Sequence, residues 1–438
     1  MADLKQLARR IFRETLAAID IPSATANILV RNGHTLCVGD ARFPLHNFRD
    51  VIVIAVGKAA HAMADGLVRV LAPDVSFHGV VSAPTPPQTP LSNFSYYVGG
   101  HPLPNEATLQ AAQAILSFLH RCTENSLVFF LLSGGGSSLM DFPLDPSLNL
   151  QGVREFYGML VNCGASIEEI NIVRKHFSAV KGGRLAVAAA PAAKITLAIT
   201  DVPVGRESAL ASGPTLPDPS TCADVHGILQ KYSLLEKLPA SIRRWIESGK
   251  MPETPKQDHP AFAKARFSLL LGMHDLFHHA HRASEAEGFI TCCDNSTDDW
   301  QVERAADFLL ARLDDFQKEN DGAAVALIAD GEVSSPVTGA GIGGRNSAFV
   351  LACAEKIAGK PITVLSAGTD GLDGNSPAAG AVADGTTFSR ARAAGMDPRD
   401  FFRRSDAYSF FKRLDDTVVT GPTGNNLRDL RIFLAESR

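Results

Sequence analysis

The sequence predicts a two-domain α/β protein, and three observations support this prediction. The chain has 438 residues, a length that suits two domains better than a single core. Apolar residues make up 45% of it and charged residues 20%, which is typical of a globular protein with a large core. Short, unbroken apolar runs alternate with helix-like stretches in both halves. Strands that are apolar on both faces fit a parallel sheet covered by helices.

The expected elements follow from this alternation. Apolar, β-rich runs predict strands at residues 51–56, 79–82, 127–132, 194–199, 323–328 and 361–365. Helix-like stretches between them predict helices at residues 58–71, 106–122, 150–163, 173–189, 275–286, 300–319 and 345–357. At the N-terminus, Leu4, Leu7, Ile11 and Leu16 have amphipathic helical spacing without the apolar core of a secretory signal.

A polar, proline-containing stretch suggests where the domains divide. Residues 249–260 read GKMPETPKQDHP and contain few apolar side chains. We therefore expect an N-terminal domain at 1–248, a linker at 249–262 and a C-terminal domain at 263–438.

Composition excludes several classes of protein. A formal net charge of -5 leaves no broad basic field for binding nucleic acid. No apolar run approaches the roughly 20 residues that cross a bilayer, so we expect no membrane association. The seven Cys include no C-x-x-C pair, which favours buried, reduced thiols over zinc ligands. We expect a cytoplasmic protein.

Glycines directly after two predicted strands indicate binding sites for anions. Gly57 and Lys58 fall where a strand turns into a helix, and a helix N-terminus together with an ammonium group attracts anions. Ser133, Gly134, Gly135, Gly136 and Ser137 follow the strand at 127–132, where backbone N–H groups can form an anion nest. A surface lysine and a tight turn without ligand are the respective alternatives.

A third glycine-rich stretch matches the dinucleotide fingerprint only formally. Gly339, Gly341 and Gly344 have the G-x-G-x-x-G spacing, but residues 334–336 separate them from the preceding strand. A loop of this kind, including Gly343 and opening a helix with Arg345, suits phosphate or carboxylate oxygens better.

Aspartates follow two further strands. Asp370 and Asp373 lie beside glycines after the strand at 361–365, where carboxylates can hold Mg²⁺ or orient a hydroxyl, although an ordinary Asp-Gly turn is the alternative. Asp201 follows the strand at 194–199. The P-loop, the protein-kinase motifs and the G-x-S-x-G elbow are absent from the sequence.

Seven motifs together resemble the class II glycerate kinases over nearly the whole chain. They are VGKAAHAMA, LLSGGGSSLM, EINIVRKHFSAVKGGRLA, ITDVP with ASGPTLPDPST, GIGGRNSAF, GTDGLDGNSPAAGA and TGPTGNNLRDL. The resemblance implies a Rossmann-like, parallel-sheet N-terminal domain and an α/β MOFRL C-terminal domain, with the active site in the cleft between them. It also implies the substrates ATP and D-glycerate, Mg²⁺ as cofactor and 2-phosphoglycerate as product. It leaves a homodimer open.

The resemblance assigns roles to particular residues. Lys58 and Arg345 match family residues whose charges would stabilise the transferring phosphoryl group, and Asp370 and Asp201 would act as metal ligand or proton acceptor. The SGGGS turn would hold the glycerate carboxylate or a phosphate. The residues expected beside it are Asn171, Arg174, Lys175, His176 and Lys181.

The sequence also departs from the family pattern. Val204, Gly205, Arg206 and Glu207 stand where we expect a small acidic run. Some family members carry the name hydroxypyruvate reductase, so an NAD(P)H-dependent reductase is the alternative enzyme. A binding protein that has lost its catalytic activity is a third hypothesis.

Overall fold

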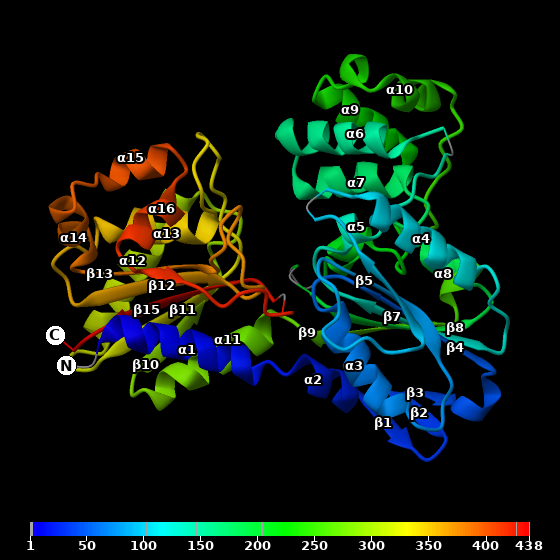
Figure 1. Cartoon of the computed structure of the whole chain (residues 1–438), viewed down its shortest axis with the longest axis horizontal. Coiled ribbons are helices and arrows are strands. Elements are labelled where there is room, and N and C mark those ends of the chain that lie inside the picture. Colours follow the sequence, from blue (N-terminus) through cyan, green and yellow to red (C-terminus); the bar gives the residue numbers. More distant parts are fainter. Residues whose placement is uncertain are drawn as a thin grey trace. The chain divides into compact units, whose positions relative to one another are not determined.

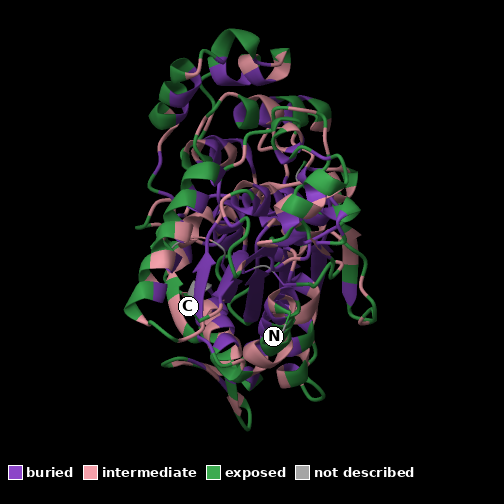
Figure 2. Ribbon diagram, turned by 90° about the vertical axis from the view of Figure 1, so that its left-hand side faces the viewer, coloured by how far each residue is buried: buried purple, intermediate pink, exposed green. Residues whose placement is uncertain are grey.

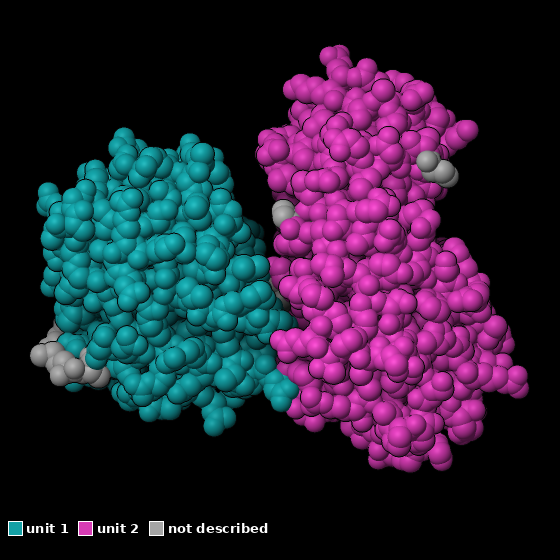
Figure 3. Space-filling model, viewed as in Figure 1, with its two compact units in different colours: residues 1–20, 272–438 teal, residues 21–271 magenta. Residues whose placement is uncertain are grey.

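The chain divides into two compact units. The computed structural model describes residues 3–101, 103–145, 147–200, 202, 205–425 and 427–437, and for Met273 the backbone alone. The larger unit is Ile21–Leu271, and the smaller comprises Met1–Asp20 and Gly272–Arg438. Figure 3 colours the two units separately.

The larger unit is built on a six-stranded sheet in which every neighbouring pair is parallel. In spatial order its strands are β6 (Phe94–Val98), β5 (His78–Ala83), β4 (Asp50–Val56), β7 (Ser126–Leu132), β8 (Ala193–Ile199) and β9 (Ala265–Leu271). All seven residues of β7 are buried, which is why its sequence is an unbroken apolar run. The predicted parallel sheet is confirmed.

Helices follow the strands of this sheet, as Figure 1 shows. They are α3 (Ala60–Leu71), α4 (Glu106–Leu119), α5 (Gly136–Leu139) and α8 (Arg184–Ala188). The unit also contains α2 (Ile21–Ile28), a small antiparallel sheet of β1 (Leu29–Asn32), β2 (Thr35–Val38) and β3 (Ala41–Pro44), and the 3-10 turns η1 (Leu45–Asn47), η2 (Glu207–Ser212), η3 (Leu235–Lys237) and η4 (Pro260–Phe262).

Four helices of the larger unit share a core of their own. They are α6 (Leu150–Asn162), α7 (Ile167–Phe177), α9 (Cys222–Lys231) and α10 (Ala240–Glu247), seen at the top of Figure 1. Aromatic packing fixes them, since the ring of Phe177 lies 4.8 Å from that of Phe156 and 4.9 Å from that of Trp245, centroid to centroid.

The helix expected at 173–189 is wrong, because the chain leaves the helical conformation after Phe177. Gly182 and Gly183 have φ of 55° and 83°. Their N–H groups donate to the carbonyls of Ser212 and Gly213, at 2.9 and 2.7 Å. The turn thus pairs with a distant loop, and a new helix, α8, begins at Arg184.

The smaller unit has a mixed six-stranded sheet. Its spatial order is β10 (Ile290–Asp294), β11 (Val325–Asp330), β15 (Asp429–Ala435), β12 (Ile362–Gly368), β13 (Gly380–Asp384) and β14 (Thr417–Val418). β10 and β11 are parallel, whereas β15 inserts antiparallel between β11 and β12. The βα alternation in this half therefore does not produce a fully parallel sheet.

Helices cover both faces of this sheet (Figure 1). One face carries α1 (Leu4–Ala18) and α11 (Met273–Ala286), and the other α12 (Val302–Glu319), α13 (Arg345–Ala354), α14 (Thr387–Ala393), α15 (Pro398–Arg403) and α16 (Ala407–Arg413). Figure 2 shows the strands as buried and the outer faces of the helices as exposed. Among the described residues, no helix has the length and apolarity to span a membrane.

The unit boundaries differ from the domain boundaries expected at 248 and 263. The N-terminal helix α1 belongs to the smaller unit, where buried Lys5 pairs with Asp416 at 2.9 Å. Residues 249–262 belong to the larger unit, where Thr254 is buried and Arg184 donates to the carbonyl of Pro252 at 3.4 Å. The stretch thus packs against α8 of the same unit.

Candidate active site

Two loops at the carboxyl edge of the parallel sheet are joined by backbone contacts. The N–H of Lys58, after β4, donates to the carbonyl of Gly134, after β7, at 3.0 Å. The next N–H, of Ala59, donates to Ser133 Oγ at 3.0 Å. Because neighbouring parallel strands end at one edge of a sheet, the Lys58 turn and the SGGGS turn lie together.

The side chains beside this junction include a histidine that the sequence did not reveal. A Cβ atom built on Gly135 would lie 3.5 Å from Lys58 Cγ and 3.1 Å from His101 Cδ2. Gly135 has φ of 80°, so a glycine is required for both conformation and space. His101 follows β6, a strand that the sequence did not predict, which explains why we missed it.

Gly57 offers a direct test of this close packing. Its φ is 130°, and a Cβ there would lie 2.1 Å from Ser133 Oγ and 2.6 Å from the Ser133 carbonyl oxygen. We predict that Gly57→Ala lowers the melting temperature by several degrees and reduces activity, because the two loops must separate. Thermal unfolding followed by circular dichroism checks this. Gly158→Ala, in α6 with nothing within 4 Å, is the matched control and should not destabilise. Equal melting temperatures for the two variants would contradict the packing.

Hydroxyl groups connect the SGGGS turn to α7. Ser137 Oγ and Ser212 Oγ are 2.6 Å apart, and Ser212 Oγ donates to Asn171 Oδ1 at 3.0 Å. Asn171 is buried in α7. The structure thus brings two predicted site residues together through Ser212, which sequence reasoning missed because it lies in the turn after β8.

The cationic side chains predicted on and after α7 have partners inside the protein. Lys181 Nζ lies 2.8 Å from Asp141 Oδ1, and burial lowers the pKa of Lys181 to about 8 although Asp141 opposes that shift. Lys175 Nζ lies 3.1 Å from Asp218 Oδ1, with both side chains buried. The guanidinium of Arg174 stacks on the Tyr157 ring at 5.0 Å. Both lysines thus pair with buried aspartates, and the substrate contacts expected from the sequence stay a prediction.

In the smaller unit, Arg345 begins α13 and binds two carboxylates. Its Nη1 and Nη2 donate to the two oxygens of Glu332 at 2.8 and 2.6 Å, and its Nε donates to Asp429 Oδ2 at 2.5 Å. Burial alone disfavours the charged guanidinium, but Asp429 and Glu332 outweigh that effect and raise the pKa of Arg345. Asp429 begins β15, a strand that the sequence did not predict.

Asp373, a predicted metal ligand, contacts the first turn of α13. Its carboxylate accepts from the N–H groups of Asn346 and Ser347, both at 2.9 Å, and from Ser347 Oγ at 2.6 Å. A Cβ on Gly344 would lie 2.3 Å from Asp373 Oδ1, so the glycine lets this carboxylate reach the first turn of α13. Asp373 thus caps α13, and Gly343 is tied to the same loop because its N–H donates to Asn375 Oδ1 at 2.8 Å.

Asp370 lies beside Asp429 at the end of β12. A Cβ built on Gly368 would lie 2.9 Å from Asp370 Oδ1 and 3.4 Å from Asp429 Oδ1. The two carboxylates therefore approach the same position beside Gly368, where a side chain would not fit. Carboxylate oxygens are the ligands that Mg²⁺ prefers, so this donor set fits a magnesium ion.

The stretch with G-x-G-x-x-G spacing does not form the turn of a dinucleotide-binding site. β11 ends at Asp330, so Gly339 does not directly follow the strand. A Cβ on Gly341 would lie 2.6 Å from the Arg404 carbonyl oxygen, which shows these glycines packing against the chain itself.

Comparisons with known proteins agree over the full length of the chain. Residues 7–247 match a family model described as a domain of unknown function (DUF4147), and residues 325–429 match the MOFRL family. The D-glycerate 2-kinase of Thermotoga maritima is 35% identical, with 98% of each chain covered. The chain belongs to the glycerate 2-kinase family.

Other members of the glycerate 2-kinase family extend this comparison. The glycerate 2-kinase of Pyrococcus horikoshii is 32% identical over 100% of this chain and 98% of its own. A crystal structure of a glycerate kinase from T. maritima superposes with a TM-score of 0.81 at 34% identity, covering 99% of both chains. A putative hydroxypyruvate reductase of Agrobacterium vitis is 35% identical over 98% of this chain and 94% of its own. Kinase and reductase names thus occur among relatives of this one chain.

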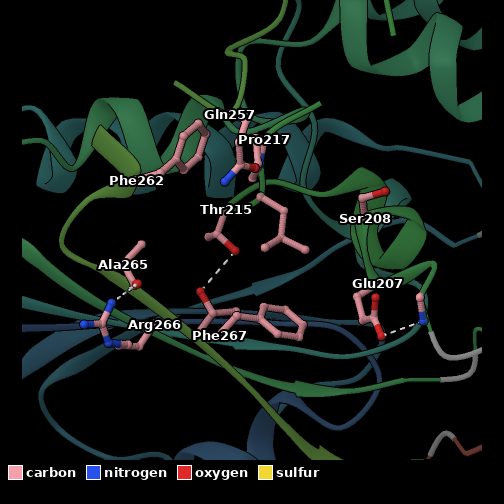
Figure 4. A pocket seen from close by; sticks show the side chains of 12 residues that line it. Glu207, Ser208, Thr215, Pro217, Gln257, Phe262, Ala265, Arg266 and Phe267 are labelled. Atoms are coloured by element: carbon pink, nitrogen blue, oxygen red, sulfur yellow. Dashed lines mark hydrogen bonds between the residues drawn. The ribbon is translucent and has the colours of Figure 1, made fainter. Parts of the chain in front are cut away.

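The loop after β8 carries the family's (S/T)DVP motif. Asp201, a predicted site residue of this glycerate 2-kinase family member, lies outside the described residues. The described part of the loop forms one wall of a cavity of about 350 Å³ in the larger unit. In Figure 4, Glu207 and Ser208 line it from the loop, and Phe267 and Arg266 line it from β9.

A buried carboxyl group at the end of β11 should make the stability of this glycerate 2-kinase family member depend on pH. Asp330 is fully buried, and burial raises its pKa from 3.8 to about 6, with Asp298 adding to the shift and Arg428 opposing it. Between about pH 4 and 6 the folded protein therefore binds more protons here than the unfolded chain does. This group's contribution to the free energy of unfolding then falls as pH rises through that window.

We therefore predict that Asp330→Asn removes part of the pH dependence of stability. The measurement is urea unfolding of both proteins at pH 5 and pH 7. The free energy of unfolding of the wild type, relative to that of the variant, should be higher at pH 5 than at pH 7. An equal difference between the two proteins at both pH values would contradict the raised pKa.

Proposed function

We propose that the chain transfers the γ-phosphoryl group of ATP to the 2-hydroxyl of D-glycerate, giving 2-phosphoglycerate and ADP. The observation that carries the proposal is the full-length similarity to the D-glycerate 2-kinase of T. maritima. A new P–O bond forms at the substrate hydroxyl, the bond from the γ-phosphorus to the β,γ-bridging oxygen breaks, and the hydroxyl proton passes to a carboxylate.

The larger unit supplies groups that bind anions. Lys58 and the SGGGS turn would hold the glycerate carboxylate or a phosphate through the ammonium group and backbone N–H donors. Phosphoryl transfer needs neutralisation of negative charge spread over three oxygens more than it needs covalent chemistry. The supporting contact is the hydrogen bond from the Lys58 N–H to the Gly134 carbonyl, which fixes the lysine backbone against that turn.

The smaller unit supplies Arg345 and Asp370. Arg345 would stabilise charge on the phosphoryl oxygens. The support is its bidentate pairing with Glu332, because a guanidinium binds the oxygens of a phosphate in the same planar geometry. Asp370 would either help hold Mg²⁺ or accept the hydroxyl proton, with Asp201 taking the other role. Where Asp370 is the metal ligand, Asp429 beside it would help hold Mg²⁺, which when bound neutralises phosphate charge.

The proposed location is the cytoplasm, where ATP and Mg²⁺ are available. The support comes from the cysteines, since all seven are free thiols and reduced cysteines are typical of that compartment.

The test measures ADP release from ATP in the presence of D-glycerate and Mg²⁺. A control assay measures NADH oxidation in the presence of hydroxypyruvate. ADP formation that depends on D-glycerate supports the kinase. NADH consumption without ADP formation would overturn it in favour of the reductase, a second candidate that the names of the A. vitis relatives suggest. Ligand-induced stabilisation without turnover in either assay would favour a binding protein.

A further inference from the structure

Three side chains of different chemistry meet in the larger unit. His176 lies in the last turn of α7, Cys222 is the first residue of α9, and Glu253 lies in the segment between α10 and η4. One ring nitrogen of His176, Cys222 Sγ and one carboxylate oxygen of Glu253 all lie within 4.8 Å of one another.

The buried histidine has one nitrogen without a hydrogen-bond partner. His176 Nδ1 bonds the Ile172 carbonyl at 2.9 Å, and because a carbonyl only accepts, Nδ1 carries the proton. Nε2 is completely buried, has no hydrogen-bond partner and lies 3.7 Å from Glu253 Oε2. With the proton on Nδ1, the neutral ring presents the Nε2 lone pair to the Glu253 carboxylate. A lone pair facing an anion at this distance leaves a place for a cation.

The surroundings match those of a metal-binding histidine. A metal ligand of this type usually donates its other ring N–H to a carbonyl or carboxylate, as His176 does to Ile172. Nitrogen, thiolate and carboxylate ligands together suit Zn²⁺, and three protein ligands leave its fourth position for water.

Several groups around the cluster oppose the binding of a cation. Burial raises the pKa of the Cys222 thiol to about 11, so the cation must displace its proton. Lys256 Nζ lies 3.2 Å from Glu253 Oε2 and must yield that contact; Arg184 also opposes a cation, while Asp218 favours it. The Glu253 side chain is half exposed, which gives a route for entry from solvent.

We propose that His176, Cys222 and Glu253 form a Zn²⁺ site that fastens the segment between α10 and η4 onto α7 and α9. The site is structural, because its ligands come from three separate segments of the larger unit. His176 therefore has a structural role in this proposal, in place of the position beside the SGGGS turn expected from the sequence.

Cobalt gives a direct test with the full-length protein after treatment with a chelator. Titration with Co²⁺ should produce one equivalent of binding, with a thiolate-to-cobalt charge-transfer band and the visible bands of a tetrahedral ion. Added Zn²⁺ should abolish both and raise the melting temperature.

Two cysteine variants distinguish this site from other thiols. Cys222→Ser should remove the charge-transfer band and weaken Co²⁺ binding by at least about 10-fold. Cys163→Ser is the matched control, since this partly buried thiol donates to the Leu160 carbonyl at 3.2 Å within the same four-helix group, and it should leave the band intact. Glu253→Gln, at a half-exposed position, should fold and also weaken binding.

Absence of the band in folded wild-type protein would overturn the proposal. Persistence of the band in Cys222→Ser would do the same.

Discussion

Replacing Lys58 with alanine should lower kcat/KM for D-glycerate and ATP by about 100-fold or more, because the variant lacks the positive charge proposed to act on the phosphoryl oxygens. The fold should be retained, because Lys58 is held in place through its backbone N–H, which alanine preserves. Steady-state ADP release and the circular dichroism spectrum measure the two effects separately.

Two further lysine variants sharpen this result. Lys58→Arg keeps the charge and should recover part of the activity. Lys237→Ala removes an exposed lysine from η3 of the same unit and should leave kcat/KM unchanged. Near-native turnover by folded Lys58→Ala would remove this residue from the site.

Replacing Arg345 with alanine should abolish most activity and, unlike the change at Lys58, also lower stability. Asp429 is buried, with its side chain 4% exposed, and loses its ion-pair partner in the variant. Removing one partner of a buried ion pair costs about 3–5 kcal/mol. We expect kcat/KM to fall by about 100-fold and urea unfolding to begin at a lower concentration.

A double variant separates the two effects of Arg345. Arg345→Ala with Asp429→Asn should regain stability without regaining activity, since the buried charge is gone but the guanidinium and one proposed Mg²⁺ ligand are both missing. The matched control is Arg399→Ala, which breaks an exposed pair with Glu355 and should leave both properties near wild type. A stable, active double variant would show that Arg345 is purely structural.

The parallel sheet of the larger unit was predictable because its strands are buried on both faces. The run at 127–132 contains only apolar residues, and it corresponds to β7. β15 was not predictable in the same way, since Arg431 interrupts its apolar pattern. Arg431 is nevertheless fully buried, because its guanidinium donates to the carbonyls of Asp330 and Gly331 at 3.1 and 2.7 Å. Such a strand becomes recognisable only when its neighbours are known.

The candidate site was predictable to the extent that it depends on glycines after strands. Lys58 and the SGGGS turn were found in this way, and the structure brings them together. The partners of charged side chains were not predictable, because they come from distant parts of the chain. Arg345 and Asp429 are 84 residues apart, and no sequence spacing indicates that they meet.

The position of the transferred phosphoryl group tests the central claim most directly. The measurement is phosphorus NMR of the product formed from ATP, Mg²⁺ and D-glycerate, compared with authentic 2- and 3-phosphoglycerate. We predict 2-phosphoglycerate, with no product from folded Lys58→Ala. Phosphorylation at the 3-position, or no phosphorylated product from folded wild-type protein, would contradict the proposed function.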